Sequence, residues 1–185
     1  MSDKETSHKE TSEKEKMALL TEAMGAYTTG VTVVTTLHEA EGKSENIGMT
    51  CNSFATVSLN PPMVMWCIRR ESASHAAFAT LAPGAGYVVN ILAENQLDTA
   101  MKFTRGTQAQ RFEGTDVHKT RSGRARLGGA LAWFDCTLTQ VIPAGDHDIL
   151  IGTIVEYRKE TIVEGNIAVQ GLAYAQRKFG RILNF

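Results

Sequence analysis

The alternation of apolar and polar positions along the chain predicts a mainly β protein with peripheral helices. The β-branched run at residues 31–36 and the apolar run at residues 63–68 have the length and composition of strands. Three more segments of this kind follow, at residues 87–92, 131–141 and 148–157. Because the strands do not alternate one for one with helices, an antiparallel barrel fits this pattern better than a doubly wound sheet.

Helical spacing occurs near the amino terminus and between the strands. Apolar residues first recur at helical intervals at Met17, Leu20, Met24 and Tyr27. This spacing predicts a helix that turns these side chains toward a core and ends at Gly25 or Gly30. Two more helices are predicted, over residues 74–81 and 94–104.

The amino-terminal residues and the rest of the chain differ in their predicted capacity to fold. Residues 1–16 hold an imperfect repeat of charged and hydroxyl residues without an apolar anchor. Such a segment buries too little surface to offset chain entropy, so we expect a disordered or frayed-helical tail. One folded domain is expected over residues 17–185. Within it, residues 106–129 show little periodicity, and we expect a long surface excursion that covers a ligand.

Composition and charge narrow the function classes. The 185 residues carry a formal net charge of −1, so no global field favours nucleic acid or an acidic membrane surface. The longest apolar runs are strand-length, and the amino-terminal segment lacks the apolar stretch of a signal peptide. The three cysteines contain no CxxC pair, which indicates reduced thiols. We therefore expect a cytoplasmic protein.

Several catalytic and binding motifs are missing from the sequence. No GxGxxG follows a predicted strand and no GxxxxGK[ST] is present, which argues against a Rossmann domain or a P-loop. The five histidines have no metal-ligand spacing with the cysteines, so no metal site is expected. Neither GxSxG nor an adjacent Cys–His unit is present to suggest acyl transfer.

The most informative segment covers residues 48–62. It is dense in small hydrogen-bonding side chains, since Thr50, Asn52 and Ser53 follow a flexible Gly48. A heteroaromatic ring with imide edges and a phosphate tail needs such a surface. The alternative is a polar sheet edge followed by a turn, and composition alone favours that alternative.

This segment resembles the flavin reductase-like family. The resemblance runs from about Met17 to about Phe179. The other matching stretches, all in family order, are residues 29–35, Asn90-Ile91-Leu92, Gln96, Phe103, residues 132–136 and Gly145-Asp146-His147. The resemblance implies a split β-barrel of the FMN-binding type with Greek-key connections. It also implies a homodimer that holds flavin near the interface.

The resemblance further implies which residues bind the cofactors. The loop at residues 46–53 is expected to lie along the flavin ring, largely through its backbone, and the strand end and turn after it to hold the ribityl and phosphate groups. His147, the catalytic candidate, is expected beside the nicotinamide. The residues expected to bind cofactors are Asn46, Ile47, Gly48, Met49, Thr50, Asn52, Ser53, Ile68, Arg69, Arg70, Ser74, Phe103, Thr104, Tyr174 and Arg177.

Each of these assignments has a structural alternative. Arg69 and Arg70 precede a helix that Ser72 or Ser74 would cap, which suits a phosphate, but they also suit a solvated charge pair. Phe103 packs either on the flavin or in the core. His147 follows a turn, where a histidine either orients an amide or lies exposed.

The function expected from this resemblance is NAD(P)H-dependent reduction of FMN or FAD by hydride transfer. The reduced flavin would diffuse to a flavin-dependent monooxygenase that hydroxylates an aromatic compound. Two alternatives stay open, namely a flavin oxidase related to pyridoxamine-phosphate oxidase and a non-catalytic barrel that binds flavin or haem. The choices between NADH and NADPH, between FMN and FAD, and among aromatic substrates also stay open.

Overall fold

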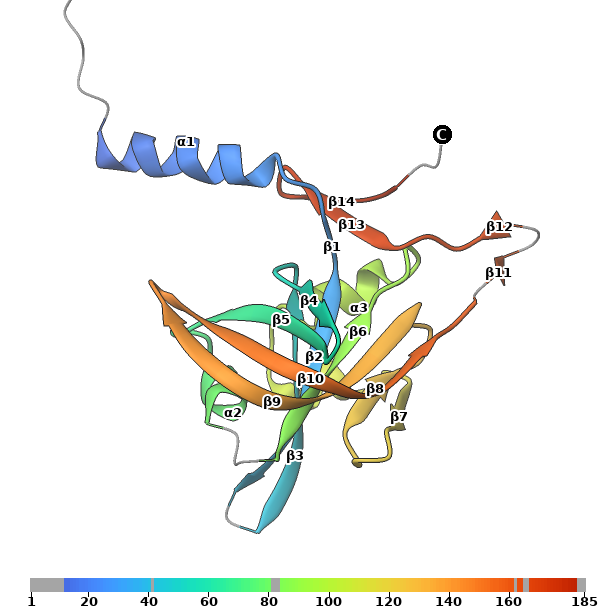
Figure 1. Cartoon of the computed structure of the whole chain (residues 1–185). Helices are drawn as coiled ribbons and strands as arrows, with labels where there is room; N and C mark the ends of the chain where they lie inside the picture. The colour runs from blue at the N-terminus through green and yellow to red at the C-terminus, as the bar shows by residue number, and fades with distance from the viewer. Residues whose placement is uncertain (1–11, 41, 81–83, 162, 165–166, 183–185) are drawn as a thin grey trace, which may run out of the picture.

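Strands dominate the computed structural model, which describes residues 12–40, 42–80, 84–161, 163–164 and 167–182. Seven of them form one antiparallel sheet in the order β3-β2-β6-β9-β10-β5-β4, which curls into the predicted split barrel (Figure 1). The strands of this sheet are β2 (Thr32–Ala40), β3 (Lys43–Cys51), β4 (Ala55–Leu59), β5 (Pro62–Arg69), β6 (Gly86–Ile91), β9 (Ala132–Ala144) and β10 (His147–Lys159).

Shorter elements surround the main sheet. The small sheets comprise β1 (Thr29–Gly30) with β13 (Leu172–Ala175) and β14 (Lys178–Arg181), β7 (Val117–Lys119) with β8 (Ala125–Leu127), and β11 (Val163–Glu164) with β12 (Ile167–Ala168). The helices are α1 (Glu13–Gly25), α2 (His75–Ala79), α3 (Leu97–Lys102) and α4 (Gln108–Phe112). No helix in the described part of the chain is long and apolar enough to cross a membrane.

The five predicted strands are all present, as β2, β5, β6, β9 and β10. The helices predicted over residues 74–81 and 94–104 are present but shorter, as α2 and α3; residue 81 lies outside the described residues. The stretch at residues 106–129, expected to form a long surface excursion, contains three elements that the sequence did not predict, α4, β7 and β8. These elements are only three to five residues long, too short to give a periodic pattern.

Two apolar clusters form the core. In the first, Trp66 of β5 contacts Phe78 and Tyr87 edge to face, at 5.0 and 5.7 Å between ring centroids. The second cluster lies under α3 and includes Phe103, whose ring stands 5.1 Å from that of Phe112 in a T-shaped contact. Such contacts are more specific than burial alone and fix the elements around each cluster.

The expectation that α1 packs on the core is wrong. The helix begins at Glu13, earlier than predicted, and Ser12 and Glu15 form a capping box at its start. All of its residues are described and none is buried. It projects from the body of the molecule, as Figure 1 shows. Residues 1–11, most of the predicted tail, lie outside the described residues.

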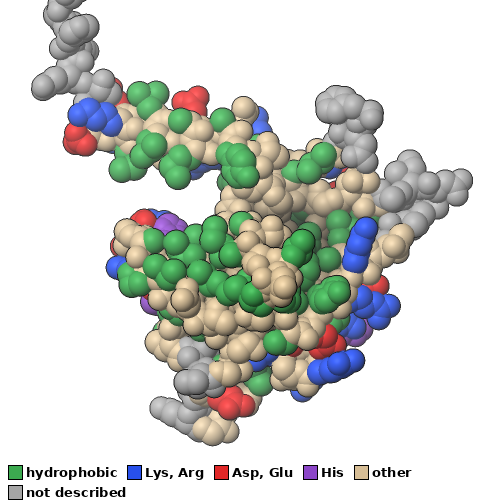
Figure 2. Space-filling model, viewed as in Figure 1, with side chains coloured by type: hydrophobic (Ala, Val, Ile, Leu, Met, Phe, Trp, Pro, Cys, Tyr) green, Lys and Arg blue, Asp and Glu red, His purple; other side chains and the backbone are tan. Residues whose placement is uncertain are grey.

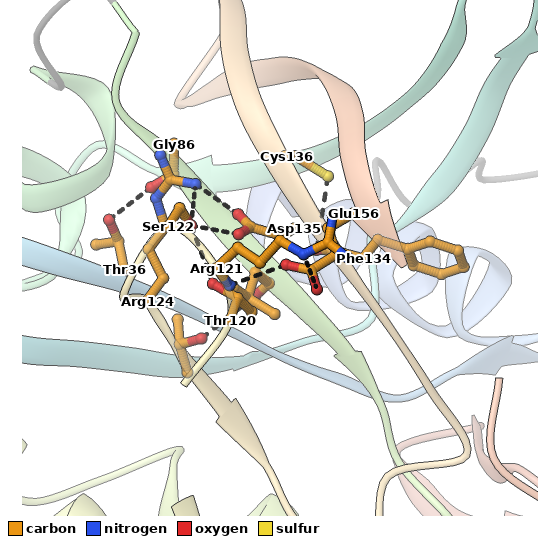
Figure 3. A network of polar contacts seen from close by, with 12 residues as sticks. Thr36, Gly86, Thr120, Arg121, Ser122, Arg124, Phe134, Asp135, Cys136 and Glu156 are labelled. Carbon is orange, nitrogen blue, oxygen red and sulfur yellow. Dashed lines mark hydrogen bonds and ion pairs between the residues drawn. The ribbon is translucent and has the colours of Figure 1, made fainter. Parts of the chain in front are cut away.

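A buried polar network fastens the β7–β8 hairpin to the main sheet (Figure 3). Asp135 of β9 is 1% exposed and pairs with Arg124, which leads into β8. The Ser122 hydroxyl donates to the same carboxylate, and the Thr35 hydroxyl of β2 donates to the Ala125 carbonyl. Because each buried charge has its partner, the network holds the hairpin without an uncompensated ion.

Candidate functional site

A pocket of about 310 Å³ lies where the end of β3, the end of α3 and the β13–β14 turn meet. Its volume lies within the range of small-molecule sites. The pocket has apolar wall residues, among them Val31 and Met101. Five of the predicted cofactor-binding residues also line it, namely Thr50, Asn52, Thr104, Tyr174 and Arg177. The sequence thus predicts a set of residues that the fold brings together from three separate segments.

The pocket wall is held in place along the free edge of β3. This strand pairs with β2 on one side and stands at the edge of the sheet on the other. There the Thr50 N–H donates to the Phe103 carbonyl (3.3 Å), and the Thr50 hydroxyl donates to the Ala100 carbonyl (2.6 Å). The edge strand is therefore fixed by α3 in place of a neighbouring strand.

Further along the same edge, two side chains of α4 form hydrogen bonds with the backbone N–H and C=O of Gly48. The Gly48 N–H donates to Gln108 Oε1 (2.9 Å), and Arg111 Nη1 donates to the Gly48 carbonyl (2.7 Å). A Cβ at this position would lie 2.6 Å from Cε1 of Phe103. We call Gln108 and Arg111 the Gly48 clamp.

Ser74, another predicted residue, belongs to the same arrangement. It is 2% exposed, and its hydroxyl accepts from Gln108 Nε2 (3.0 Å) and Arg111 Nη1 (3.4 Å). It is the N-cap residue of α2, but its side chain makes no capping hydrogen bond. The clamp therefore joins two predicted residues that are 26 positions apart, Gly48 and Ser74.

Arg111 differs electrostatically from most arginines of the described chain. Its hydrogen bonds go to uncharged oxygens, those of Gly48, Ser74 and Arg105. Burial lowers the pKa of its guanidinium, since the charged form loses solvation. A partly desolvated cation of this kind favours an anionic group of a ligand beside it.

A third group of predicted residues lies at the paired ends of β5 and β10. The register places His147 opposite Arg69 and Asp148 opposite Ile68. Asp148 Oδ2 lies 2.7 Å from His75 Nε2, and Arg70 Nε donates to Asp148 Oδ1 at 2.8 Å. These contacts, first that of His75 and then that of Arg70, lower the pKa of the Asp148 carboxyl. Arg70 is thus already engaged with a carboxylate.

His147 lies on the outer side of this strand end. Its Nδ1 stands 2.7 Å from Asp146 Oδ1, and this hydrogen bond is the main cause that lowers the pKa of Asp146. Arg69 Nη2 approaches the same carboxylate at 3.6 Å, with 64% of its side chain exposed. Because Asp146 holds one ring nitrogen, the imidazole is oriented with Nε2 directed away from the turn.

The side chains of most remaining predicted residues pack in the core or form hydrogen bonds within the fold. Ile68 and Phe103 are fully buried and Ile47 is 6% exposed, so any contact of theirs with a ligand is through the backbone. Met49 packs against the first core cluster, and the Ser53 hydroxyl bonds the Cys67 backbone at 2.9 and 3.0 Å. Asn46 is a half-buried residue of β3.

Sequence reasoning missed Gln108 and Arg111. They belong to α4, in the stretch expected to form a long surface excursion. Thr107 and Gln110 form a capping box at the start of this helix, which is a recognisable signal at its spacing of three residues.

No group of three or more metal-ligating side chains occurs in the described part of the chain.

The chain was then compared with known proteins. Residues 24–183 match the family model described as flavin reductase like domain. The chain belongs to this family. It is 39% identical over 133 residues to FMN reductase (NADH) SmoA of Agrobacterium fabrum (strain C58 / ATCC 33970), a match that covers 72% of this chain and 71% of that protein.

Two further relatives extend this comparison. The reductase component of the flavin-dependent trigonelline monooxygenase of Acinetobacter baylyi (strain ATCC 33305 / BD413 / ADP1) is 39% identical over 142 residues, which is 77% of this chain and 44% of that protein. The NADH:FAD oxidoreductase SgcE6 of Streptomyces globisporus C-1027, solved with NAD and FAD fragments, superimposes with a TM-score of 0.78 at 27% identity over 94% of this chain and 97% of its own. The chain spans about half the length of several curated relatives that it matches.

Proposed function

We propose that this chain is an NAD(P)H-dependent flavin reductase that supplies reduced FMN or FAD to a flavin-dependent monooxygenase. The observation that carries the proposal is the 310 Å³ pocket, which gathers five residues predicted to bind the cofactors in a chain of the flavin reductase family. The named activities of SmoA and SgcE6 support the same reaction and both flavins.

The residues present fit a flavin in two respects. The Asn52 amide lines the pocket without a hydrogen-bond partner among the described residues, so it is free to meet a polar ring edge. Arg111, which contacts only uncharged oxygens, suits a phosphate, and the buried Ser74 hydroxyl accepts from its guanidinium and helps to orient it.

The protein's part in the reaction is to bind and orient. A flavin bound in the pocket would supply the acceptor for a hydride from the nicotinamide. Val31 and Met101 give the pocket an apolar wall, and Thr50 fixes the β3 edge through its two bonds to α3. We infer that His147, oriented by Asp146, holds the nicotinamide amide. The hydride step needs no proton transfer by these residues.

We infer that Arg111, oriented by Ser74, holds the flavin phosphate in preference to Arg69 and Arg70. Arg69 and Arg70 approach carboxylates, those of Asp146 and Asp148, whereas Arg111 does not. An incoming phosphate beside Arg70 would compete with the carboxylate that already accepts from it.

The assembly and partners belong to the same proposal. We infer a homodimer with the flavin near the interface, in the cytoplasm, and a separate oxygenase reached by diffusion of reduced flavin. The trigonelline monooxygenase relative supports such a partnership and an aromatic substrate for the oxygenase.

The test is NAD(P)H oxidation with free flavin in excess, measured for NADH and NADPH against FMN and FAD. The proposal predicts many turnovers per protein molecule, with a rate that saturates in flavin. Nucleotide oxidation that does not depend on added flavin would favour a bound-flavin oxidase. If neither nucleotide is oxidised with either flavin, the result would favour the non-catalytic binding protein. The absorption spectrum of the purified protein would then distinguish bound flavin from bound haem.

A further inference from the structure

Another pocket, of about 390 Å³, lies where the β7–β8 hairpin meets the start of β9 and the end of β10. The strand register brings its side chains together in two pairs. His118 of β7 lies opposite Arg126 of β8. Trp133 of β9 lies opposite Arg158 of β10, at the other end of that strand from His147. Cross-strand partners project from the same face of a sheet, so each pair lines the pocket together.

Charged side chains of both signs surround this pocket. Figure 2 shows positive, negative and histidine side chains gathered over the region of β7, β8 and the end of β10, at the lower right of the view. The lining includes two carboxylates and two guanidiniums, those of Asp116, Glu160, Arg126 and Arg158. Arg158 Nε lies 2.9 Å from Glu160 Oε1. Asp116 Oδ1 lies 3.2 Å from Nε2 of His118. Of these four charged groups, Arg126 alone has no ion pair with a described residue.

Trp133 brings a second group without a partner to the same pocket. Its side chain lines the pocket, and the residue is only 4% exposed. Its indole Nε1 makes no hydrogen bond with the described part of the chain. A buried tryptophan N–H normally finds an acceptor, because an unsatisfied donor away from water is costly. A ligand with an acceptor oxygen would satisfy this donor.

The two groups without partners lie side by side. The Arg126 guanidinium lies over the Trp133 ring, with Cζ 5.3 Å from the ring centroid. The attraction between a cation and the face of an indole keeps the guanidinium beside the ring. An acceptor oxygen lies about 2.9 Å from a donor nitrogen, so one carboxylate can accept from the guanidinium and from Nε1 together. Because one donor is charged, such a pair of hydrogen bonds is stronger than a neutral pair.

We propose that this pocket binds a small organic monocarboxylate, whose carboxylate accepts hydrogen bonds from Arg126 and from the Trp133 indole. The volume lies within the range of small-molecule sites and leaves room for an organic body beside the carboxylate. A phosphate dianion fits less well, because its second charge would face Asp116 and Glu160 without a further unpaired guanidinium. The site is independent of the proposed flavin reduction, since its described lining residues are not those of the cofactor pocket.

The test uses acetate as the probe and follows the indole N–H signals in a two-dimensional proton–nitrogen NMR spectrum. The chain has two tryptophans, so Trp66, in the first core cluster, supplies a reference signal, and Trp133→Phe assigns the two. At constant ionic strength, acetate should shift the Trp133 signal along a saturable curve and leave the Trp66 signal in place. Acetamide, which has a similar shape without the charge, should cause less than about a tenth of this shift. A Trp133 signal that ignores acetate, or that responds equally to acetamide, overturns the proposal.

The role of the guanidinium is tested with Arg126→Gln, which keeps a hydrogen-bonding side chain and removes the charge. The acetate dissociation constant should rise at least about ten-fold. The matched control is Arg121→Gln on the same hairpin, whose side chain is 91% exposed and does not line the pocket. An unchanged Trp66 signal shows that each variant is folded. A folded Arg126→Gln variant that binds acetate like the parent contradicts the proposed site.

Two further titrations test the ligand class and the separateness of the site. Inorganic phosphate should bind at least about ten-fold more weakly than acetate, and equal or tighter phosphate binding would contradict a monocarboxylate site. FMN at saturating concentration should leave the acetate dissociation constant unchanged. Displacement of acetate by FMN would place the acetate in the cofactor pocket and overturn the proposal. A protein that binds acetate at Trp133 but no FMN would contradict the proposed function alone.

Discussion

The amide N–H of Gly48 donates to Gln108 Oε1 across 2.9 Å, between residues 60 positions apart in the chain. A side chain from a short helix thereby takes the place of the missing strand beside the sheet edge. This contact fixes the part of β3 that leads directly into the cofactor pocket, because Thr50 follows two residues later.

The first prediction concerns Gly48→Ala. The added Cβ would lie 2.6 Å from the Phe103 ring, which is fully buried and packs against Phe112. We expect a loss of about 1–3 kcal/mol in the free energy of unfolding and weaker flavin binding. Denaturant titration measures the first effect. At Gly30 no atom of the described chain lies within 4 Å of an added Cβ, so Gly30→Ala is the control.

Arg111→Met should weaken FMN binding by about 1.5–3 kcal/mol, because it removes a charge-assisted hydrogen bond to the phosphate. Riboflavin has the same ring but no phosphate, and its affinity should change little. Titration of both flavins into parent and variant measures the difference. Arg69→Ala and Arg70→Ala are the comparison variants. A larger FMN-specific loss in either of these would assign the phosphate to the β5–β10 end.

His147→Ala should slow hydride transfer without affecting flavin affinity. Loss of nicotinamide orientation should raise the barrier by about 1–3 kcal/mol, roughly a five- to a hundred-fold loss in rate. Single-turnover reduction and flavin titration measure the two quantities separately. His118→Ala, which removes another exposed histidine paired with an aspartate, serves as the control. Equal reduction rates in parent and variant would remove His147 from the site.

The network in Figure 3, whose labelled residues do not line the cofactor pocket, predicts a stability effect. Asp135→Ala leaves the Arg124 guanidinium, which is only 11% exposed, without its carboxylate. Breaking a buried pair in this way should cost about 3–5 kcal/mol in the free energy of unfolding. Arg121→Ala removes a side chain that is 91% exposed and should cost little. Similar losses in the two variants would show that the buried pair has no special weight.

The lowered pKa of Asp148 predicts a pH dependence of stability. A carboxyl whose folded pKa lies below its unfolded value stabilises the fold fully above the unfolded value, near pH 3.9, and loses this contribution as the pH falls through the folded pKa. Asp148→Asn should therefore be less stable than the parent at neutral pH, and the difference should shrink in acid. Glu71→Gln, at an exposed position, is the control. A difference that is constant with pH would contradict the ionic origin of the effect.

The strands were predictable because their signal is local. Residues 63–68 and 148–157 carry the apolar and β-branched composition of β5 and β10, and no distant contact is needed to recognise it. The helix at α1 was also visible from its spacing, but its environment was not. The periodicity of Met17, Leu20 and Met24 predicts an apolar stripe on one side of the helix. It does not predict whether that stripe packs against the rest of the same chain, and in the structure it is exposed.

The sequence predicted the site residues that lie close together along the chain, and it did not predict the contacts between distant segments. In the 46–53 segment, Thr50 and Asn52 line the pocket, as predicted. The Gly48 clamp depends on two side chains of α4, whose five residues are fixed mainly by a capping box and tertiary contacts. Pairing of Arg70 with Asp148 depends on strand register, which a motif does not contain.

The most direct test of the account is anaerobic mixing of the purified protein with one equivalent of flavin and one of NADH or NADPH, followed by absorbance. The account predicts that the flavin band bleaches while an equal amount of nicotinamide is oxidised, far faster than in the same mixture without protein. It also predicts that admitting oxygen restores the flavin band. A flavin that binds but stays oxidised in the presence of both nucleotides would contradict the account.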